Sequence, residues 1–380
     1  NRAYLEVVDG KLRLAKKNET GKVIEATATI TWSKDGRTLS KPVTVNLYPA
    51  ASSRKTLMNS IAATYTNSSS DWVVFDMAAY AKCGFGSNTT DTENYLNLTI
   101  NELAGTSPLA TDRTKAEIIL AALGIDSTRL TPLDGAEYSN AAKLAAMNLG
   151  TSHYTAPWVL LAEQAGQMKL SDKQRSSMIS LLTSSLGPDG LFVTKWAGET
   201  YADPDTTGTA LTALAAYADR AAVKSFIDKA VAGLSKAQNS NGSYGNVNSD
   251  AMVIIGLAAV GIDPASDERF VKGGCSLADA LLLYVNDGQN GFTAGYISGT
   301  QGEKAQALAT EQGFRALVTL EQFAKDTSKA FNIYTLSTAP VSSTDPDNPD
   351  TPGQPAQPEQ PQPGTATGSG TLPSEGGSTG

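Results

Sequence analysis

The stretch DPDTTGTALTALAAYAD at residues 203–219 decides the fold that we expect for this chain. It opens with acidic and small residues that favour a helix start, and it continues as an Ala- and Leu-rich run of about three turns. The central turns carry no charge, which is typical of a helix covered on most sides. The same phrase recurs as TDRTKAEIILAALGID at 111–126 and VNSDAMVIIGLAAVGID at 247–263, so it predicts a repeated helical unit.

Other segments extend the repeat along the chain. Weaker copies of the phrase occur at 71–84, 153–166 and 309–323. Amphipathic segments lie between the copies, for example at 172–186 and 220–238, and their charges fall on one side of a helical wheel. We expect the Ala/Leu runs to be inner helices and the amphipathic segments to be outer ones. A spacing of roughly forty to fifty residues is that of two-helix repeats, so the sequence predicts a mainly α fold of about six helix pairs, closed into an α/α toroid over residues 50–335.

The connections that follow the outer helices carry turn signals. PDGLF at 188–192, NGSYG at 241–245 and NGFTAGY at 290–296 each contain Asp-Gly or Asn-Gly. Glycine in such pairs predicts a tight turn with a positive φ.

Two of these features carry a resemblance to a known family. The link from Gln238 to Gly245 and the inner helix from Asp205 to Leu214, with its D-T and AL-x-AL pattern, resemble a toroid shared by several protein classes. These are the terpene cyclases, the protein prenyltransferase β-subunits, the complement thioester domains and the α-domain of cobalamin carriers. The resemblance covers residues 52–325. It implies the fold, and the function must be argued from the site, because one fold hosts many sites.

The two ends of the chain differ from the helical part. Residues 1–49 alternate apolar and polar side chains around a Lys-Asp-Gly-Arg turn, and they resemble the last strands of a bacterial immunoglobulin-like module. A full sandwich needs more strands, so we expect further modules beyond both ends. Residues 336–380 are rich in Pro, Gly, Ser and Thr, which predicts a disordered linker or stalk.

The composition bears on the location of the protein and on the partners that it can bind. The formal net charge is −8 and the basic residues are scattered, so we expect no nucleic-acid partner. A membrane-spanning helix needs an apolar run of about 20 residues, and the sequence contains none. With the immunoglobulin-like segment and the stalk, these features predict a secreted or cell-surface protein, held in the cell wall of a Gram-positive bacterium.

The two cysteines leave two alternatives open. Cys83 follows the first inner helix, and Cys275 is expected in the last outer helix. Their repeats would be neighbours in a closed ring, so a disulfide could staple the closure in an oxidising compartment. The alternative is two unrelated buried thiols.

A ligand site is expected where the inner helices begin. Their N-terminal ends surround the mouth of a funnel, and they present polar groups and helix dipoles to it. Aromatic rings near helix starts can stack on a ligand or plug the barrel end, and an Asp at a helix start can be a cap without any further role. The expected ligand-binding residues are Trp72, Asp112, Arg113, His153, Tyr154, Trp158, Thr206, Thr207, Tyr244, Asp250 and Glu311, with Asp76 and Arg315 as further candidates.

The strongest catalytic candidate is Asp203-Pro204-Asp205-Thr206-Thr207. It resembles the D-x-D-D-T motif of class II terpene cyclases, which implies that Asp205 would be a general acid, with Asp203 beside it. Thr206 stands where that motif has its third acid, and few aromatics are present to stabilise carbocations.

The sequence gives weaker support for the other reactions known from α/α toroids. A metal site is not expected, because His153 is the single histidine and neither cysteine lies near it in the repeat order. Cys83-Gly84 continues with Phe85, so the thioester motif is missing. A polysaccharide lyase or glycosidase could use His153 and Tyr154 with Arg113 and Asp205.

The sequence therefore favours a non-catalytic binding or adhesion module, with a small-molecule, glycan or protein ligand held at the funnel mouth. A corrinoid is one candidate ligand, and the sequence identifies no cofactor with certainty. The alternatives are a terpene-cyclase-like enzyme that uses Asp205 as its acid, and a polysaccharide lyase or glycosidase.

Overall fold

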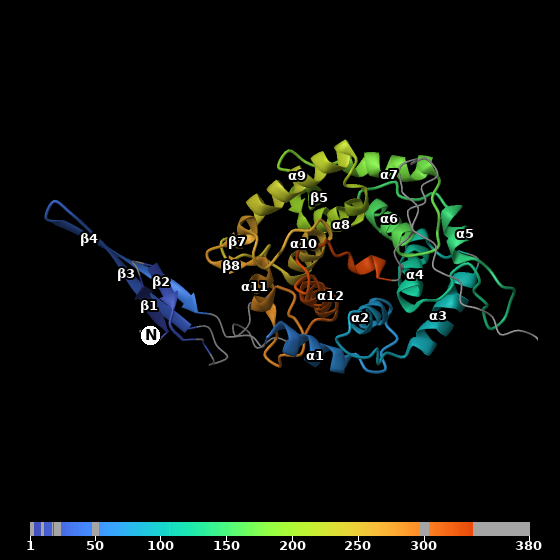
Figure 1. Ribbon diagram of the computed structural model, residues 1–380, viewed down its shortest axis with the longest axis horizontal. Coiled ribbons are helices and arrows are strands. Elements are labelled where there is room, and N and C mark those ends of the chain that lie inside the picture. Colours follow the sequence, from blue (N-terminus) through green and yellow to red (C-terminus); the bar gives the residue numbers. More distant parts are fainter. Residues whose placement is uncertain are drawn as a thin grey trace, which may run out of the picture. The chain divides into compact units, whose positions relative to one another are not determined.

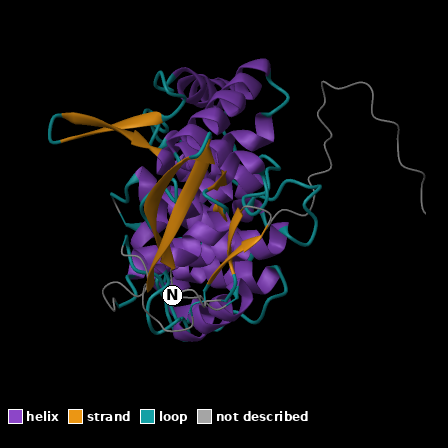
Figure 2. Cartoon of the chain, turned by 90° about the vertical axis from the view of Figure 1, so that its left-hand side faces the viewer, coloured by secondary structure: helices purple, strands orange, loops and turns teal. Residues whose placement is uncertain are grey.

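The computed structural model describes residues 4–8, 11–16, 18, 24–47, 53–105, 107–295 and 304–336. Within these ranges the chain is mainly helical, as predicted, with twelve α-helices. The strands of the described residues pair as two-stranded ribbons, drawn in orange in Figure 2.

Six of the helices contact one another in a closed order (Figure 1). Each contacts the next along the chain, and the last contacts the first. We call them the inner helices, and they are the six Ala/Leu runs identified in the sequence: α2 (Asp71–Lys82), α4 (Ala110–Leu123), α6 (Ala156–Ala165), α8 (Pro204–Leu214), α10 (Val247–Ala259) and α12 (Ala307–Phe323).

The other six helices alternate with the inner ones along the chain. Each contacts at least one inner helix, and Figure 1 shows them around the inner six. The amphipathic segments at 172–186 and 220–238 are confirmed as two of these outer helices. The outer set is α1 (Arg54–Thr64), α3 (Thr92–Ala104), α5 (Asn140–Ala145), α7 (Asp172–Ser184), α9 (Ala221–Ala237) and α11 (Leu277–Leu281).

Hydrogen bonds between helix starts show that neighbouring inner helices run in the same direction. Ser249, near the start of α10, donates a hydrogen bond to Asp205, near the start of α8. Asn248 of α10 donates to Gln312 in the first half of α12. The N-terminal ends of these helices therefore meet at one end of the ring, as the sequence predicted.

Two glycines allow α8 and α10 to approach closely. A Cβ atom on Gly208 would collide with the backbone carbonyl of Met252, and a Cβ atom on Gly256 would collide with the carbonyl of Gly208. Glycine is costly inside a helix, so its presence here reflects the close backbone contact.

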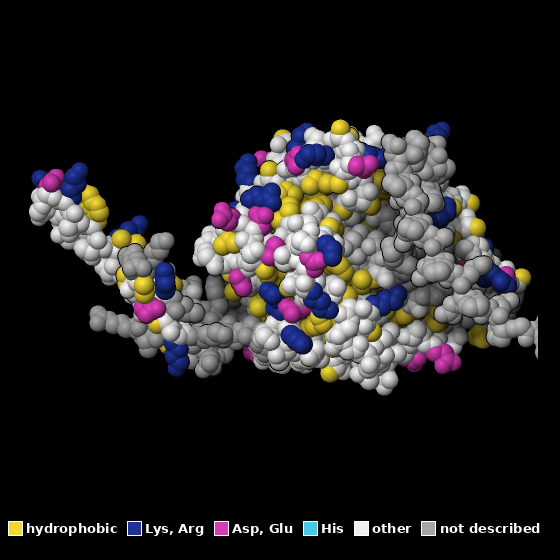
Figure 3. Space-filling model, viewed as in Figure 1, with side chains coloured by type: hydrophobic (Ala, Val, Ile, Leu, Met, Phe, Trp, Pro, Cys, Tyr) yellow, Lys and Arg dark blue, Asp and Glu magenta, His cyan; other side chains and the backbone are white. Residues whose placement is uncertain are grey.

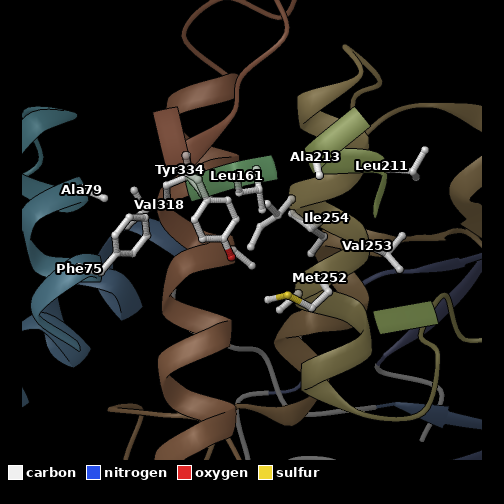
Figure 4. Packing of buried hydrophobic residues seen from close by; sticks show 14 of the residues in the cluster. Phe75, Ala79, Leu161, Leu211, Ala213, Met252, Val253, Ile254, Val318 and Tyr334 are labelled. Carbon is white, nitrogen blue, oxygen red and sulfur yellow. The ribbon is translucent and has the colours of Figure 1, made fainter. Parts of the chain in front are cut away.

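The centre of the ring is filled by side chains rather than by an open channel. Figure 4 shows Tyr334 between Phe75 of α2, Leu161 of α6 and Val318 of α12. Tyr334 belongs to η4 (Ile333–Thr335), a short 3-10 helix that follows α12 and lies within the ring in Figure 1. Its ring stacks on Phe75 with 5.3 Å between centroids. The sequence pattern did not predict this insertion.

The structure confirms two of the three predicted turns and differs from the prediction in the third. Gly190 and Gly242 have positive φ, as the Asp-Gly and Asn-Gly pairs predicted. In the third link the positive φ falls on Gln289, so the prediction that placed it at Gly291 was wrong. The Asn286 carboxamide accepts a hydrogen bond from the Asn290 backbone N–H and closes that turn instead.

The links also repeat one hydrogen bond. The backbone N–H of Phe192 donates to the Thr207 hydroxyl, and that of Phe292 donates to the Thr310 hydroxyl. In the middle link the N–H of Tyr244 donates to the Asp250 carboxylate. A polar side chain in the first turns of an inner helix thus satisfies the preceding link, because a buried backbone N–H without a partner would be costly.

The N-terminal segment forms β-hairpins, as predicted. β1 (Leu5–Val8) pairs with β2 (Lys11–Leu14), and β3 (Ile24–Lys34) pairs with β4 (Arg37–Leu47). Asp35 and Gly36 both have positive φ, so the Lys-Asp-Gly-Arg turn is confirmed. The likeness to an immunoglobulin-like module remains a prediction.

Two further ribbons lie among the helices. β5 (Phe192–Trp196) pairs with β6 (Glu199–Asp203), and β7 (Val271–Lys272) pairs with β8 (Cys275–Ser276). Neither hairpin was predicted. Cys275 therefore lies in a strand before α11, not in the outer helix where we expected it, and both cysteines are free.

Three further expectations concern the C-terminal stalk, membrane-spanning helices and the distribution of charge. Of the linker or stalk predicted at 336–380, residues 337–380 lie outside the described residues. Among the described residues, no helix is long and apolar enough to cross a membrane. On the face shown in Figure 3, basic and acidic side chains of the helical part are interspersed rather than gathered by sign.

Candidate functional site

A pocket of about 440 Å³ opens where α4 and α6 begin. The start of α2 and the loop before α6 complete its wall. This is the N-terminal side of the inner helices, where the sequence placed the mouth of a funnel. The lining residues are Trp72, Ala110, Thr111, Asp112, Thr114, Lys115, Ile118, Asn148, Leu149, Gly150, Thr151, Tyr154, Thr155, Trp158 and Val159.

Two indoles form an aromatic wall in this pocket. The rings of Trp72 and Trp158 lie 5.4 Å apart between centroids, with 48° between their planes. Both are partly buried and pack against the core of the ring. Tyr154 adds a third ring, and 44% of its surface is exposed. Exposed aromatic faces of this kind bind apolar ring faces of a ligand while leaving its polar edges free.

Hydrogen-bonding groups surround the aromatic wall. Thr111 and Asp112 lie in the first turn of α4, and Asn148 and Thr151 lie in the loop before α6. Lys115, one turn further along α4, forms an ion pair with Asp71. The pocket therefore offers both donors and acceptors beside aromatic faces, which is the composition of a site for a polar small ligand.

Four of the predicted ligand-binding residues lie together in this pocket: Trp72, Asp112, Tyr154 and Trp158. Arg113 does not line it. Its guanidinium donates hydrogen bonds to the Asn140 side chain at 3.0 Å and to the Leu103 carbonyl at 2.8 Å. These two hydrogen bonds direct the Arg113 side chain toward α3 and α5 instead of the pocket.

His153 also lies outside the lining. Its ring stacks on Phe192 at 5.0 Å, with 8° between the planes, and it contacts Tyr154 at 4.1 Å. It packs between the loop and the β5–β6 ribbon.

The acidic segment at the start of α8 is held by local hydrogen bonds. Asp203 is the N-cap and accepts from the backbone N–H and the hydroxyl of Thr206. Thr207 is buried and donates to the Asp203 carbonyl. Burial raises the pKa of Asp205, whose carboxylate accepts from Ser249. None of these four residues lines the 440 Å³ pocket.

Tyr244 and Asp250 form hydrogen bonds that hold the link before α10 in place. The Tyr244 hydroxyl donates to the Leu234 carbonyl of α9, and Asp250 accepts from the Tyr244 backbone. Asp250 is fully buried, and burial raises its pKa to about 7. The two residues connect an inner helix to an outer one and lie apart from the pocket.

Glu311 belongs to a buried charge cluster behind the pocket. It accepts a hydrogen bond from Arg315 at 2.8 Å, and Arg315 also donates to Asp76 at 2.6 Å. The Arg315 guanidinium lies 4.6 Å from the ring centroid of Trp72. Glu311 thus acts on the aromatic wall through Arg315 rather than by lining the pocket.

The loop at 148–151 and Lys115 are pocket residues that the sequence interpretation missed. The loop carries no helical period, and only its short distance before α6 could have indicated its position. Lys115 lies one turn beyond the helix start on which the prediction concentrated.

Neither known proteins nor the arrangement of possible metal ligands assigns a function to this pocket. No protein-family model and no curated protein matches the chain. Among the described residues, no group of three or more His, Cys, Asp or Glu side chains is placed to hold a metal ion.

Proposed function

We propose that the twelve helices form an α/α toroid of the terpene cyclase and prenyltransferase type, and that it is a non-catalytic ligand-binding or adhesion module. The closed order of the inner helices and the alternation of inner and outer helices support the toroid. In this proposal the protein is secreted or displayed on the surface of a Gram-positive bacterium, and the toroid binds a ligand there.

The observation that carries the binding function is the pocket at the N-terminal side of the inner helices. Its volume of about 440 Å³ lies in the lower part of the range for small-molecule sites. Three aromatic rings share it with a set of hydroxyl, amide and carboxylate groups. Sugars match this composition, because their C–H faces stack on aromatic rings while their hydroxyls hydrogen-bond at the edges. A glycan end is therefore the ligand class that we favour.

The pocket favours binding over catalysis of glycoside cleavage. Hydrolysis by a glycosidase uses two carboxyl groups on either side of the bond, and Asp112 is the single acid among the described residues that line the pocket. A lyase site would need further acid and base groups near Tyr154. His153 and Arg113 are engaged elsewhere, with Phe192 and with Asn140.

A corrinoid remains a less favoured ligand. A corrin macrocycle with its side chains is larger than this pocket, so it would have to rest on the rim. The exposed ring of Tyr154 and the partly buried ring of Trp158 are the groups that would contact it.

The alternative enzymatic function rests on Asp205. Burial raises the pKa of this carboxyl, which would keep a proton available for an alkene, as a class II cyclase requires. The Ser249 hydroxyl donates to the same carboxylate, and hydrogen bonding to the charged form works against protonation.

Native mass spectrometry of the full chain separates these functions. The protein is incubated with glycan oligomers, a corrinoid and an isoprenoid diphosphate. A binding module gives a retained ligand of unchanged mass, and Asp205→Asn leaves that complex intact. A class II cyclisation leaves the mass of the isoprenoid unchanged, so the released compound is also analysed by chromatography. A cyclised isomer that is absent with Asp205→Asn would refute the binding function and establish the enzyme.

A further inference from the structure

The chain after α12 returns through the ring of inner helices. The backbone N–H of Phe331 donates to the Ala258 carbonyl at 2.9 Å, and the Asn332 side chain donates to the Thr212 carbonyl at 3.4 Å. Ala258 and Thr212 lie at the C-terminal ends of α10 and α8. Residues 331–335, which we call the C-terminal strap, therefore enter the ring from the end opposite the pocket.

The strap places Tyr334 directly behind the aromatic wall of the pocket. The ring of Tyr334 lies 5.5 Å from Trp158 and 6.3 Å from Trp72 between centroids, in edge-to-face geometry with both. Its other neighbour, Phe75, is stacked on it at 5.3 Å. Only 2% of Tyr334 is exposed, and Figure 4 shows it enclosed by side chains of several helices.

A second contact links Tyr334 to the same wall. The Arg315 guanidinium donates to the Tyr334 hydroxyl at 3.4 Å, and it lies over the ring of Trp72. Asp76 and Glu311 hold this guanidinium in place. Tyr334 thus touches Trp72 both directly and through Arg315.

We propose that Tyr334 is a positioning residue of the ligand site, through which the C-terminal strap sets the spacing and tilt of Trp72 and Trp158. Without a ring behind them, the two indoles could turn into the centre of the ring of helices. A ligand would then have to order them when it binds, which lowers affinity. The inference rests on the proposed binding function for its purpose, and its geometry can be tested without any ligand.

The test uses tryptophan fluorescence of the full chain. Trp32→Phe and Trp196→Phe remove the other two tryptophans of the sequence, so that Trp72 and Trp158 alone report on the wall. In this parent, Tyr334→Leu is expected to raise the acrylamide quenching constant about twofold or more, because the indoles lose the edge-to-face contacts that hold them in place. Tyr334→Phe keeps the ring and is expected to restore most of the parent value.

A matched control separates positioning from general stability. Tyr284 is also buried to 2% exposure, and it lies in η3 (Leu282–Tyr284) after α11. Tyr284→Leu is expected to lower the melting temperature while leaving quenching at the parent value. Quenching that is unchanged in Tyr334→Leu, or raised equally by both substitutions, would overturn the positioning role. If Tyr334→Leu loses its far-UV circular dichroism, Tyr334→Met replaces it, with the same expectations.

The binding function and the positioning role of Tyr334 can be refuted separately. A parent protein that retains no compound by mass spectrometry refutes the binding function, and the quenching change would still establish the contact between strap and wall. A parent that binds a glycan with the same Kd and quenching as Tyr334→Leu refutes the positioning role alone.

Discussion

Arg315 and Asp76 form an ion pair of 2.6 Å whose two side chains are 1% and 0% exposed. Glu311 brings a second carboxylate to the same guanidinium at 2.8 Å. Burial raises the pKa of Asp76, and its Oδ2 atom has no hydrogen-bond partner among the described residues. One guanidinium therefore pairs with two carboxylates in the interior, next to the wall of the candidate ligand pocket.

Removal of that cation is expected to destabilise the fold strongly. Arg315→Met leaves Asp76 and Glu311 without a partner, and an unpaired buried charge costs about 3–5 kcal/mol. Urea unfolding measures the loss. Lys224→Met removes an exposed ion pair with Asp228 and is expected to cost less than about 1 kcal/mol. An equal, small effect of both substitutions would mean that the buried cluster does not carry this stability.

Asp250 predicts a pH dependence of stability. Its pKa is about 7 in the fold because of burial, and about 4 in an unfolded chain. Between these values the folded state holds a proton that the unfolded state has released, so stability decreases as pH rises from about 4 to about 7 and then levels off.

Asp250→Asn removes this titration while its side-chain oxygen can still accept from the Tyr244 N–H. The free energy of unfolding of the variant, relative to the parent, should rise over the same pH window. The rise is a few kcal/mol at most, since one pKa unit corresponds to about 1.4 kcal/mol. Chemical denaturation at several pH values measures it. Parallel pH curves for parent and variant would exclude Asp250 as the source.

The close contact of α8 and α10 predicts a steric effect. Gly208→Ala places a Cβ atom against the Met252 carbonyl, and overpacking of this kind costs about 1–3 kcal/mol. Gly295→Ala adds the same methyl where the nearest atom is 3.4 Å away, so stability should change little. Melting temperatures of the two variants compare them, and a neutral Gly208→Ala would show that the helices can separate without loss.

The two free cysteines lead to a prediction about the reactivity of their thiols. Burial raises the pKa of Cys83 and that of Cys275 to about 11, so both thiols should react slowly with Ellman's reagent in the native protein. Denaturation without reductant should release two reactive thiols per chain. A denatured, unreduced protein without reactive thiols would instead establish the Cys83–Cys275 bridge.

The helical architecture was largely predictable, and the reason is local. Runs such as 203–219 and 247–263 combine a capped start with an uncharged apolar centre, and this pattern depends on helix geometry alone. Trp72, Asp112, Tyr154 and Trp158 could be placed near one another because helix starts gather at one end of the ring.

The remaining features depend on contacts between distant parts of the chain. Tyr334 lies in a segment without periodicity, and its burial requires the ring to be closed around it. The direction of Arg113 is set by Asn140 and the Leu103 carbonyl on the outer helices. The β5–β6 ribbon lies in a link where only the turn glycine stood out. Propensity and spacing hold no information on such partners.

The binding function depends most directly on Tyr154, the most exposed aromatic ring of the pocket. Isothermal titration calorimetry of the full chain with the glycan that mass spectrometry retains best should show a Kd about tenfold or more higher for Tyr154→Ala, as for the loss of a central aromatic contact. Tyr201→Ala removes a similarly exposed tyrosine from β6, outside the pocket, and should leave the Kd unchanged. Equal affinities of parent and Tyr154→Ala would contradict a ligand site at the start of α4 and α6.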